Sequence, residues 1–538
     1  MAFSSGPESV DVLVIGAGVT GIYQLHRARE AGFSVAMLEA GDGVGGTWYW
    51  NRYPGARFDS ESYTYGYLFS RELFDEWEWR EHFAEQPETE RYLNHVVDRF
   101  DLRRHIRFGA RVRSAIYDEP SGTWSVTTKD GTTGNAGVTT ARFLVAATGV
   151  LSVPYVPDIP GCDDFGGVQH HTGRWPAEPV DFAGKRVAVV GTSSSGVQVV
   201  PAIVDEVASI TVYQRSANWC TPLNNRPITA DEQVQLREGF DQLCEVLNTS
   251  IHGFHHPMNE RSAFDDTPEE RLAFFETMWA SPGFMKFTSN YVDILMNAEA
   301  NAEWCEFIAG KIRGIVDDPD TAERLIPKDH RYGEKRPPYV AGYFEAFNRP
   351  HVSLVDLRDT PIVRVTEAGI ETSEGVQELD IIVWATGFDF GTGAMSRMGI
   401  RGRDGLALEQ HWAEGPTTFL GVQTSGFPNL FFPGGPHAAA GNNPRYNGDQ
   451  VDFITDTLVY VRDHGHDVIE VTPEAEERWT AMIDRAAART PFGTIGQYVG
   501  GNIPGKPRRY LLNAGGRPKL FREMARVVET DYAALHLS

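Results

Sequence analysis

Two glycine-rich turns in the sequence have the composition and spacing of nucleotide-binding loops. The first, Gly16-Ala17-Gly18-Val19-Thr20-Gly21, follows a short apolar run and opens a helical pattern. In such a loop the first glycine makes a tight turn, the second lets the backbone approach a pyrophosphate, and the third lets helix and strand pack closely. Glu39 ends the next apolar run, where a carboxylate accepts hydrogen bonds from ribose hydroxyls and repels a 2′-phosphate. This loop therefore predicts FAD or NAD rather than NADP.

The second turn, Gly191-Thr192-Ser193-Ser194-Ser195-Gly196, has the same placement, with Ser193 at the second glycine position. The strand that follows ends in Arg215-Ser216 and carries no acid. A guanidinium suits a 2′-phosphate because its paired N–H groups match the phosphate oxygens. This loop predicts NADPH, with a purely structural βαβ unit as the alternative that Ser193 leaves open.

A chain with a flavin-type site and an NADPH site is predicted to be a flavoprotein reductase or monooxygenase. Disulfide reductases need a dithiol beside the flavin, but the four cysteines (Cys162, Cys220, Cys244 and Cys305) show no CxxC spacing. The same spacing argues against a zinc site and a disulfide framework. Hydride transfer to a flavin, followed by oxygen chemistry and without a metal, is the remaining expectation.

The composition of the chain bears on which partners it can bind and where it is located. The 538 residues include 49 Lys and Arg against 73 Asp and Glu, a formal net charge of −24, which disfavours nucleic acid as a partner. An apolar run long enough to span a membrane is lacking, and the first residues do not resemble a signal peptide. We expect a cytoplasmic protein that binds no membrane and is a monomer or weak homo-oligomer.

The elements that must position these loops form an α/β fold with two Rossmann-like dinucleotide-binding domains, for FAD and NADPH, and a helical insert. Apolar runs at 12–15, 35–38, 186–190 and 210–214 predict buried parallel strands. Two further strands each end in Ala-Thr-Gly, within "FLVAATGV" and "IIVWATGF", and mark crossings between domains. We expect an FAD domain in 1–150 and 386–538, the latter with the substrate and C-terminal loops, an NADPH domain in 151–223 and 331–385, and the insert in 224–330.

Two further motifs lie beside these loops. "FGGVQHHTGRWP" supplies Phe165, Gly167, His171, Trp175 and Pro176, and "GGTWYWNRYPGARFDSES" supplies a Gly-Gly-x-Trp…Tyr-Pro-Gly-x-x-x-Asp pattern that ends at Asp59. With these motifs the chain resembles the type I Baeyer–Villiger monooxygenases over nearly its whole length, from Val12 to Arg508.

The resemblance implies an FAD- and NADPH-dependent enzyme that acts on a small-molecule ketone and O₂. NADPH reduces FAD, O₂ then gives a C4a-peroxyflavin, and one oxygen is inserted next to the ketone carbonyl to form an ester or lactone, with release of water and NADP⁺. Two alternatives remain at this point, an N- or S-oxygenating flavin monooxygenase and a non-catalytic dinucleotide-binding redox sensor. Trp175-Pro176 and the Asp59 pattern argue against an N- or S-oxygenating monooxygenase. A redox sensor that catalyses no reaction would have no evident use for Arg336 and Asp59.

The resemblance also implies residue roles. Arg336 is the catalytic arginine, Asp59 orients it, and Lys335 assists Arg215 at the 2′-phosphate; in isolation Lys335-Arg336 would be a solvated basic loop and Asp59 a turn cap. The expected FAD contacts are Gly16, Gly18, Thr20, Gly21, Glu39, Thr47, Trp48, Asp59, Tyr65 and Val112. The expected NADPH contacts are Arg57, Gly191, Thr192, Ser193, Ser194, Ser195, Gly196, Gln198, Arg215, Ser216, Lys335, Arg336 and Gln497.

The sequence departs from the family near the substrate. Gln497 stands where the family often has a tryptophan that reaches NADP and lines the pocket. Asn443, Pro444 and Arg445 are candidates for the pocket wall, and the small residues 438–441 suggest room for a bulky ketone.

The first of the two motifs raises separate expectations about the chain between the domains. It shows no strand period, so we expect a strap between them, extended at Trp175-Pro176. We expect Gly167 to adopt a backbone conformation closed to other residues. The spacing selects His171 over His170, and we expect His171 to hold the strap rather than transfer protons.

Overall fold

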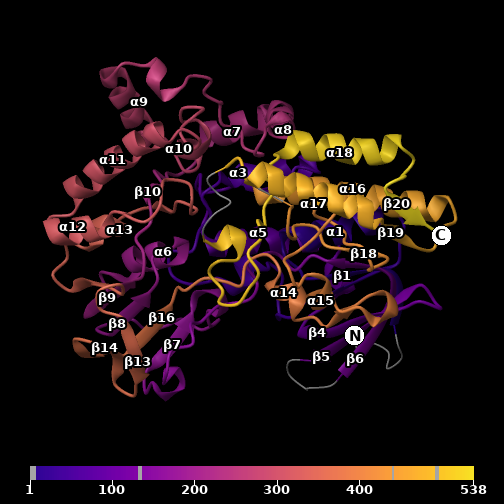
Figure 1. Ribbon diagram of the computed structural model, residues 1–538, viewed down its shortest axis with the longest axis horizontal. Helices are drawn as coiled ribbons and strands as arrows, with labels where there is room; N and C mark the ends of the chain where they lie inside the picture. The colour runs from indigo at the N-terminus through magenta and orange to yellow at the C-terminus, as the bar shows by residue number, and fades with distance from the viewer. Residues whose placement is uncertain (1–7, 131–135, 439–440, 491–495) are drawn as a thin grey trace.

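The computed structural model describes residues 8–130, 136–438, 441–490 and 496–538. One sheet has the strand order β17-β4-β5-β6-β1-β2-β3, with β18 also paired to β6. Strand β1 (Glu8–Ile15) runs parallel to β2 (Val35–Leu38) and β6 (Ala136–Ala146), and helix α1 (Val19–Glu30) makes the crossover from β1 to β2. Strands β4 (Ala110–Asp118) and β5 (Thr123–Asp130) extend the sheet as an antiparallel pair. This sheet lies at the lower right of Figure 1.

The C-terminal part of the chain completes this sheet. Strand β17 (Ile400–Arg401) pairs with β4, and β18 (Leu430–Phe431) pairs with the end of β6. Helix α16 (Asn443–Asp463) packs on α1, where the Gln24 side chain donates to Thr455 Oγ1 over 3.0 Å. The apolar stretches 12–15 of β1 and 143–146 of β6 are buried on both faces, as continuous apolar runs predict.

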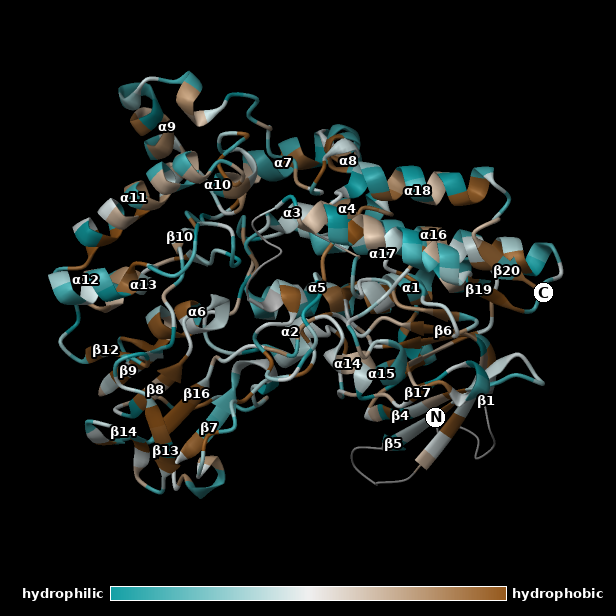
Figure 2. Cartoon of the chain, in the orientation of Figure 1, coloured by the Kyte–Doolittle hydropathy of each residue, from teal (hydrophilic) through white to brown (hydrophobic). Residues whose placement is uncertain are grey.

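The second sheet is fully parallel, with the order β12-β9-β8-β16-β7. Its strands are β12 (Val352–Asp356), β9 (Ser209–Gln214), β8 (Arg186–Val190), β16 (Ile381–Trp384) and β7 (Val168–His171). Helix α6 (Ser194–Ile203) connects β8 to β9. Hydrophobic residues concentrate in β8 and β16, at the lower left of Figure 2. The expectation that the motif around His171 lacks a strand was wrong, because β7 forms the edge of this sheet.

The insert between β10 (Thr221–Pro222) and β11 (Tyr339–Val340) is helical. Its helices are α7 (Ala230–Glu238), α8 (Phe240–Thr249), α9 (Pro268–Ala280), α10 (Met285–Thr288), α11 (Ala298–Ile315) and α12 (Pro319–Leu325). Capping boxes begin α7 and α9, since Thr229 and Thr267 each accept from the backbone three residues later while a glutamate returns the bond. The buried face of α11 carries Trp304, and these helices lie at the upper left of Figure 1.

The remaining elements surround these layers. Near the first loop they are α2 (Thr47–Trp50), α3 (Ser62–Tyr65), α4 (Arg71–Glu76), α5 (Gln86–Arg99) and β3 (Ile106–Arg107). Later elements are α13 (Tyr343–Ala346), β13 (Ile362–Thr366), β14 (Gly369–Thr372), β15 (Gly375–Glu378), α14 (Gly393–Ser396), α15 (Leu408–His411), β19 (Ile469–Val471), α17 (Pro473–Ala487), α18 (Arg517–Glu529) and β20 (Leu535–Leu537). Among the described residues, no helix combines the length and the apolar character that a membrane crossing requires.

Candidate active site

A cavity of about 620 Å³ lies where the first sheet, the helical insert and the C-terminal segment meet. Its wall contains residues from both ends of the chain, so it forms only in the folded protein. Predicted site residues that line it are Gly16, Gly18, Thr20, Glu39, Thr47, Trp48, Tyr65, Val112, Arg336, Asn443 and Pro444. The residues of the second loop do not line it.

The first loop has a tightly packed base and an open centre. Gly16 has a φ of +101°, and a Cβ there would lie 2.6 Å from the Ala147 carbonyl oxygen. A Cβ on Gly21 would lie 1.9 Å from the Gly16 carbonyl oxygen, so both positions require glycine. A Cβ on Gly18 would meet only Gly46, at 3.5 Å, which leaves this backbone accessible to a ligand. The loop therefore fits a pyrophosphate that approaches Gly18.

Glu39 lies buried beside this loop. Its Oε2 accepts from the Ala17 N–H and its Oε1 from the Gly41 N–H, each over 2.7 Å. Burial raises the pKa of this carboxyl, and the backbone hydrogen bonds oppose that shift. Glu39 thus holds the loop and its side chain lies at the cavity wall, where a ribose is expected.

Trp48 and Tyr65 form one wall of the cavity. Trp48 Nε1 donates to Tyr65 Oη over 2.9 Å, and Phe58 stacks on Tyr65 with ring centroids 4.5 Å apart. Thr47 begins α2 on the same side, and Val112 reaches the cavity from β4.

Arg336 and Asp59 form the charged pair of the site. Arg336 Nη2 donates to both carboxylate oxygens of Asp59, over 2.6 and 2.7 Å, and Nη1 lies 3.3 Å from Ser194 Oγ. The guanidinium carbon also lies 5.2 Å from the centroid of the Phe284 ring. Although burial opposes the charge, the adjacent Asp59 raises the pKa of Arg336. The arginine therefore keeps a permanent positive charge at the cavity.

The second loop repeats the base of the first. Gly191 has a φ of +113°, and its Cβ would lie 2.4 Å from the Ala385 carbonyl oxygen. A Cβ on Gly196 would lie 2.1 Å from the Gly191 carbonyl oxygen. Ser193, at the centre of this loop, is exposed. Thr192 donates to the Ser216 carbonyl over 2.8 Å, and Ser195 Oγ lies 3.1 Å from Thr172 Oγ1.

Arg215, Ser216 and Lys335 gather at the end of β9. Lys335 Nζ donates to Ser216 Oγ over 2.8 Å, and Arg215 is exposed beside them. Burial lowers the pKa of Lys335, and the Arg215 charge lowers it further against the attraction of Asp329. Asp329 accepts from Ser216 Oγ over 2.8 Å and lies 3.6 Å from Lys335 Nζ. The two cations thus converge where a 2′-phosphate is expected.

Gln198 and Arg57 lie where helix α6 meets the loop that carries Asp59. Gln198 Oε1 accepts from Tyr53 Oη over 2.8 Å, and its Nε2 donates to the Arg57 carbonyl over 3.1 Å. The Arg57 guanidinium is paired with Glu81 and Glu85, at 3.2 and 2.5 Å. The Gln198 side chain, expected to contact NADPH, thus also links α6 to the loop that carries Asp59, whereas the Arg57 side chain connects that loop to the segment before α5.

His171 ends strand β7 in a buried position. Its Nδ1 accepts from the Gly173 N–H over 2.9 Å, and burial lowers the pKa of the imidazole to about 4. Trp175 is buried, and its backbone N–H donates to the Trp50 carbonyl over 3.2 Å. This bond connects the segment to α2, and the positioning role of His171 stays a prediction.

The conformation expected for Gly167 was wrong. It is not among the glycines with a positive φ. A Cβ would instead lie 2.5 Å from the Asp380 carbonyl oxygen and 2.6 Å from the Phe165 ring. Close packing, rather than backbone conformation, requires glycine at this position.

Only some of the residues predicted to line the substrate pocket lie at the cavity. Asn443 and Pro444 line the cavity, whereas the Arg445 guanidinium turns away and donates to the Gly66 carbonyl. Ala438 is buried, and a Cβ on Gly441 would lie 2.3 Å from the His252 carbonyl oxygen. Residues 439 and 440 and the side chain of Gln497 lie outside the described residues.

Sequence reasoning missed several cavity residues. Phe284, Phe287 and Thr288 come from the helical insert, in which no site residue was predicted. Arg174 also lines the cavity, with its guanidinium 4.5 Å from the centroid of the Trp50 ring and a hydrogen bond to the Ser152 carbonyl over 2.6 Å. The apolar "PGFMKF" run was the available signal for the insert, and the position of Arg174 within the His171 motif was the signal for the arginine.

Comparisons with known proteins agree over the whole chain. A family model described as pyridine nucleotide-disulphide oxidoreductase matches residues 13–259. The 2-oxo-Δ³-4,5,5-trimethylcyclopentenylacetyl-CoA monooxygenase of Pseudomonas putida is 42% identical over 98% of this chain and 98% of its own length. A Baeyer–Villiger monooxygenase of Pseudooceanicola batsensis is 38% identical over 98% of this chain and 96% of its own.

Solved structures agree with these relatives. A crystal structure of OTEMO in complex with FAD and NADP has a TM-score of 0.94 at 42% identity, covering 99% of this chain and 100% of that one. With two nucleotide loops, a charged pair at the wall of the cavity beside the first of them, and relatives matched over nearly the whole chain, the chain belongs to the Baeyer–Villiger monooxygenases, flavoenzymes that use FAD and NADPH.

Proposed function

We propose that the protein inserts one oxygen atom next to the carbonyl of a ketone, with Arg336 as the catalytic residue and Asp59 as its positioning partner. The observation that carries this proposal is the Arg336 guanidinium at the cavity wall, held by both oxygens of Asp59 at 2.6 and 2.7 Å. A guanidinium stabilises negative charge without giving up a proton at working pH. Asp59 fixes Nη2 and Ser194 Oγ accepts from Nη1 over 3.3 Å, so the guanidinium is held at the cavity wall from two sides.

FAD fits the first loop. Gly18 keeps the backbone open for the pyrophosphate, and Glu39 lies at the wall for the ribose. Thr47, Trp48, Tyr65 and Val112 then surround the rest of the cofactor. When bound and reduced by NADPH, FAD supplies the electrons for activation of O₂. The apolar cavity wall excludes water from that step.

NADPH fits the second loop. Arg215 and Lys335 supply two positive charges to the 2′-phosphate, and Ser216 supplies a hydroxyl between them. Asp329 competes for Lys335 and Ser216, so we expect it to release them when the phosphate binds. Arg57, Thr192, Ser193, Ser194, Ser195, Gln198 and Gln497 remain proposed contacts of the same cofactor.

The substrate is proposed to be a ketone that enters beside the insert. Phe284 and Phe287 provide apolar side chains, and Asn443 and Pro444 line the same cavity. The Thr288 hydroxyl is already engaged, because it donates to the Phe284 carbonyl over 3.2 Å and lies 2.7 Å from His256 Nδ1. Of the described residues among 438–441, Gly441 lines the cavity, and the preference for a bulky ketone stays a prediction from the small side chains in the sequence. A ketone panel with NADPH and O₂, analysed for ester by mass spectrometry, tests both points, and turnover of small cyclic ketones alone would count against the bulky class.

Arg336→Ala tests the central assignment. We expect NADPH to reduce the flavin anaerobically at a near-normal rate, while ester formation falls by at least about 100-fold because the charge is lost. Arg336→Lys is the matched control, since it retains a cation and should keep part of the activity. Ester formation by the alanine variant at the parental rate would refute the role of Arg336.

A further inference from the structure

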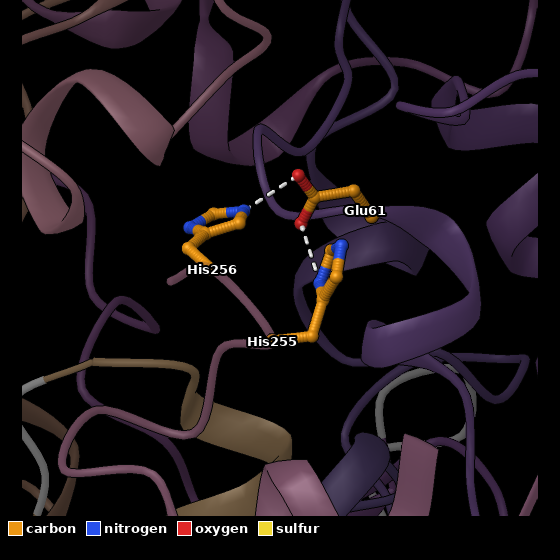
Figure 3. Close-up of side chains that lie close together, drawn as sticks. All are labelled: Glu61, His255 and His256. Atoms are coloured by element: carbon orange, nitrogen blue, oxygen red, sulfur yellow. Dashed lines mark hydrogen bonds and ion pairs between the residues drawn. The ribbon is translucent and has the colours of Figure 1, made fainter. Parts of the chain in front are cut away.

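Glu61, His255 and His256 form a cluster outside the cavity wall. Glu61 precedes α3, two residues after Asp59, whereas the histidines belong to the segment between α8 and α9. One nitrogen or oxygen atom from each residue lies within 4.8 Å of the others. Figure 3 shows the carboxylate of Glu61 between the two imidazole rings.

Two atoms of the cluster that could bind a metal ion have no hydrogen-bond partner among the described residues and face one another. His256 Nε2 lies 2.7 Å from Glu61 Oε1, whereas His255 Nδ1 lies 3.8 Å from Glu61 Oε2, too far for a hydrogen bond. Within the described part of the chain, Glu61 Oε2 and His255 Nδ1 are buried without a hydrogen-bond partner. The side chains of Glu61 and His256 are 3% and 0% exposed. A buried carboxylate with a free oxygen requires compensation by a positive group.

The outer nitrogens of both histidines meet hydroxyl groups. His256 Nδ1 lies 2.7 Å from Thr288 Oγ1, and His255 Nε2 lies 3.3 Å from Tyr63 Oη. Each ring is therefore oriented by one nitrogen while the other faces Glu61. Histidines that ligate metals are oriented in this way, with the second ring nitrogen bonded to an outer partner.

We propose that Glu61, His255 and His256 bind a divalent transition-metal ion of the zinc type. Two imidazoles and one carboxylate suit zinc, whereas magnesium and calcium prefer oxygen ligands alone. Tetrahedral zinc places its ligand atoms roughly 3.4 Å apart, given bonds of about 2.0–2.2 Å. The two distances from Glu61, 2.7 and 3.8 Å, bracket this value, and all three ligand atoms lie within 4.8 Å of one another, so side-chain shifts without a change of fold bring them to one ion. Water occupies the fourth position, on the side of His255, whose side chain is 28% exposed.

The bound ion would connect the insert to the loop that carries Asp59. Because the ion binds the folded state, it should raise the temperature of unfolding. It would also fix His256, which contacts Thr288 at the cavity.

The test uses untagged holoenzyme, stripped with a chelator that is then removed. Isothermal titration with ZnCl₂ should show one bound equivalent in the wild type, and MgCl₂ should not bind at this site. His255→Asn and Glu61→Gln should weaken zinc binding by at least about tenfold, and Tyr63→Phe by roughly 10- to 100-fold because an outer partner is lost. His536→Asn, which changes an exposed histidine, should bind zinc as the wild type does.

Thermal unfolding gives a second readout. Zinc should raise the midpoint of the wild type and of His536→Asn, but not that of His255→Asn. Because His255 is partly exposed, its substitution decides the question even if Glu61→Gln does not fold. The absence of a zinc equivalent in the wild type, or equal zinc affinity in His255→Asn, would overturn the proposal.

Discussion

The two nucleotide loops share their bases and differ at the positions that face a ligand. In both loops the first glycine packs against an alanine carbonyl, Ala147 in one case and Ala385 in the other, and each alanine belongs to an Ala-Thr-Gly strand end. At the centre, Gly18 is replaced by Ser193, and at the end of the second strand Glu39 is replaced by Arg215. Close packing within the fold thus requires the glycines at the base of each loop, whereas the residues that face the ligand differ with the nucleotide that each loop is expected to bind.

The largest effects are expected at the shared base. Gly21→Ala and Gly196→Ala place Cβ 1.9 and 2.1 Å from a backbone carbonyl oxygen, so each should lower the free energy of unfolding by about 3 kcal/mol. Thermal or urea unfolding measures this. Gly310→Ala, on the open face of α11, is the control and should stabilise slightly. A wild-type unfolding midpoint in Gly21→Ala or Gly196→Ala would contradict the shared base.

The next largest effect is expected at Arg215, whose positive charge at the second loop replaces the negative charge of Glu39 at the first. Arg215→Ala should reduce the preference for NADPH over NADH by roughly 10- to 100-fold, because a charge-assisted hydrogen bond contributes about 1.5–3 kcal/mol. The ratio of kcat/KM for the two cofactors measures it. Arg364→Ala, on an exposed strand, serves as the control. An unchanged ratio would remove Arg215 from the phosphate site.

The buried His171 at the end of strand β7 should make the free energy of unfolding depend on pH. The pKa of His171 is lowered to about 4 in the folded state, against a usual value of 6.5, so the unfolded state binds more protons between these values. Stability should therefore fall as the pH drops from 6.5 to 4. His171→Asn should reduce this loss by about 1–2 kcal/mol, measured by urea unfolding across this range. The same pH slope in His171→Asn and wild type would show that His171 is not the group responsible.

The smallest effects are expected from exchanging the loop centres. Gly18→Ser should weaken FAD binding by about tenfold, because its side chain enters the pyrophosphate space, whereas Ser193→Gly should lower the KM for NADPH by no more than about threefold. FAD retention on dilution and NADPH titration measure the two. Equal effects at both positions would mean that the pyrophosphates approach both loops equally closely.

Local patterns predicted the βαβ units and the helical insert because each depends on a short apolar run and a turn. They did not predict that Phe284 and Thr288 of the insert reach the cavity, since that depends on packing between distant segments. The strand at His171 was missed for a related reason. Its segment is an edge strand, and its pairing with β16 involves residues more than two hundred positions later.

The pairing of β18 with β6 affects how this chain folds during synthesis. Leu430 and Phe431 complete the edge of β6 beside Leu144 and Val145. At roughly 5–20 residues per second, the ribosome needs about 15–60 s to make the intervening chain. During this interval the end of β6 has an open hydrogen-bonding edge beside buried apolar residues, a feature that promotes pairing between chains. Nascent chains that stall before Leu430 should therefore aggregate more readily than the full-length chain.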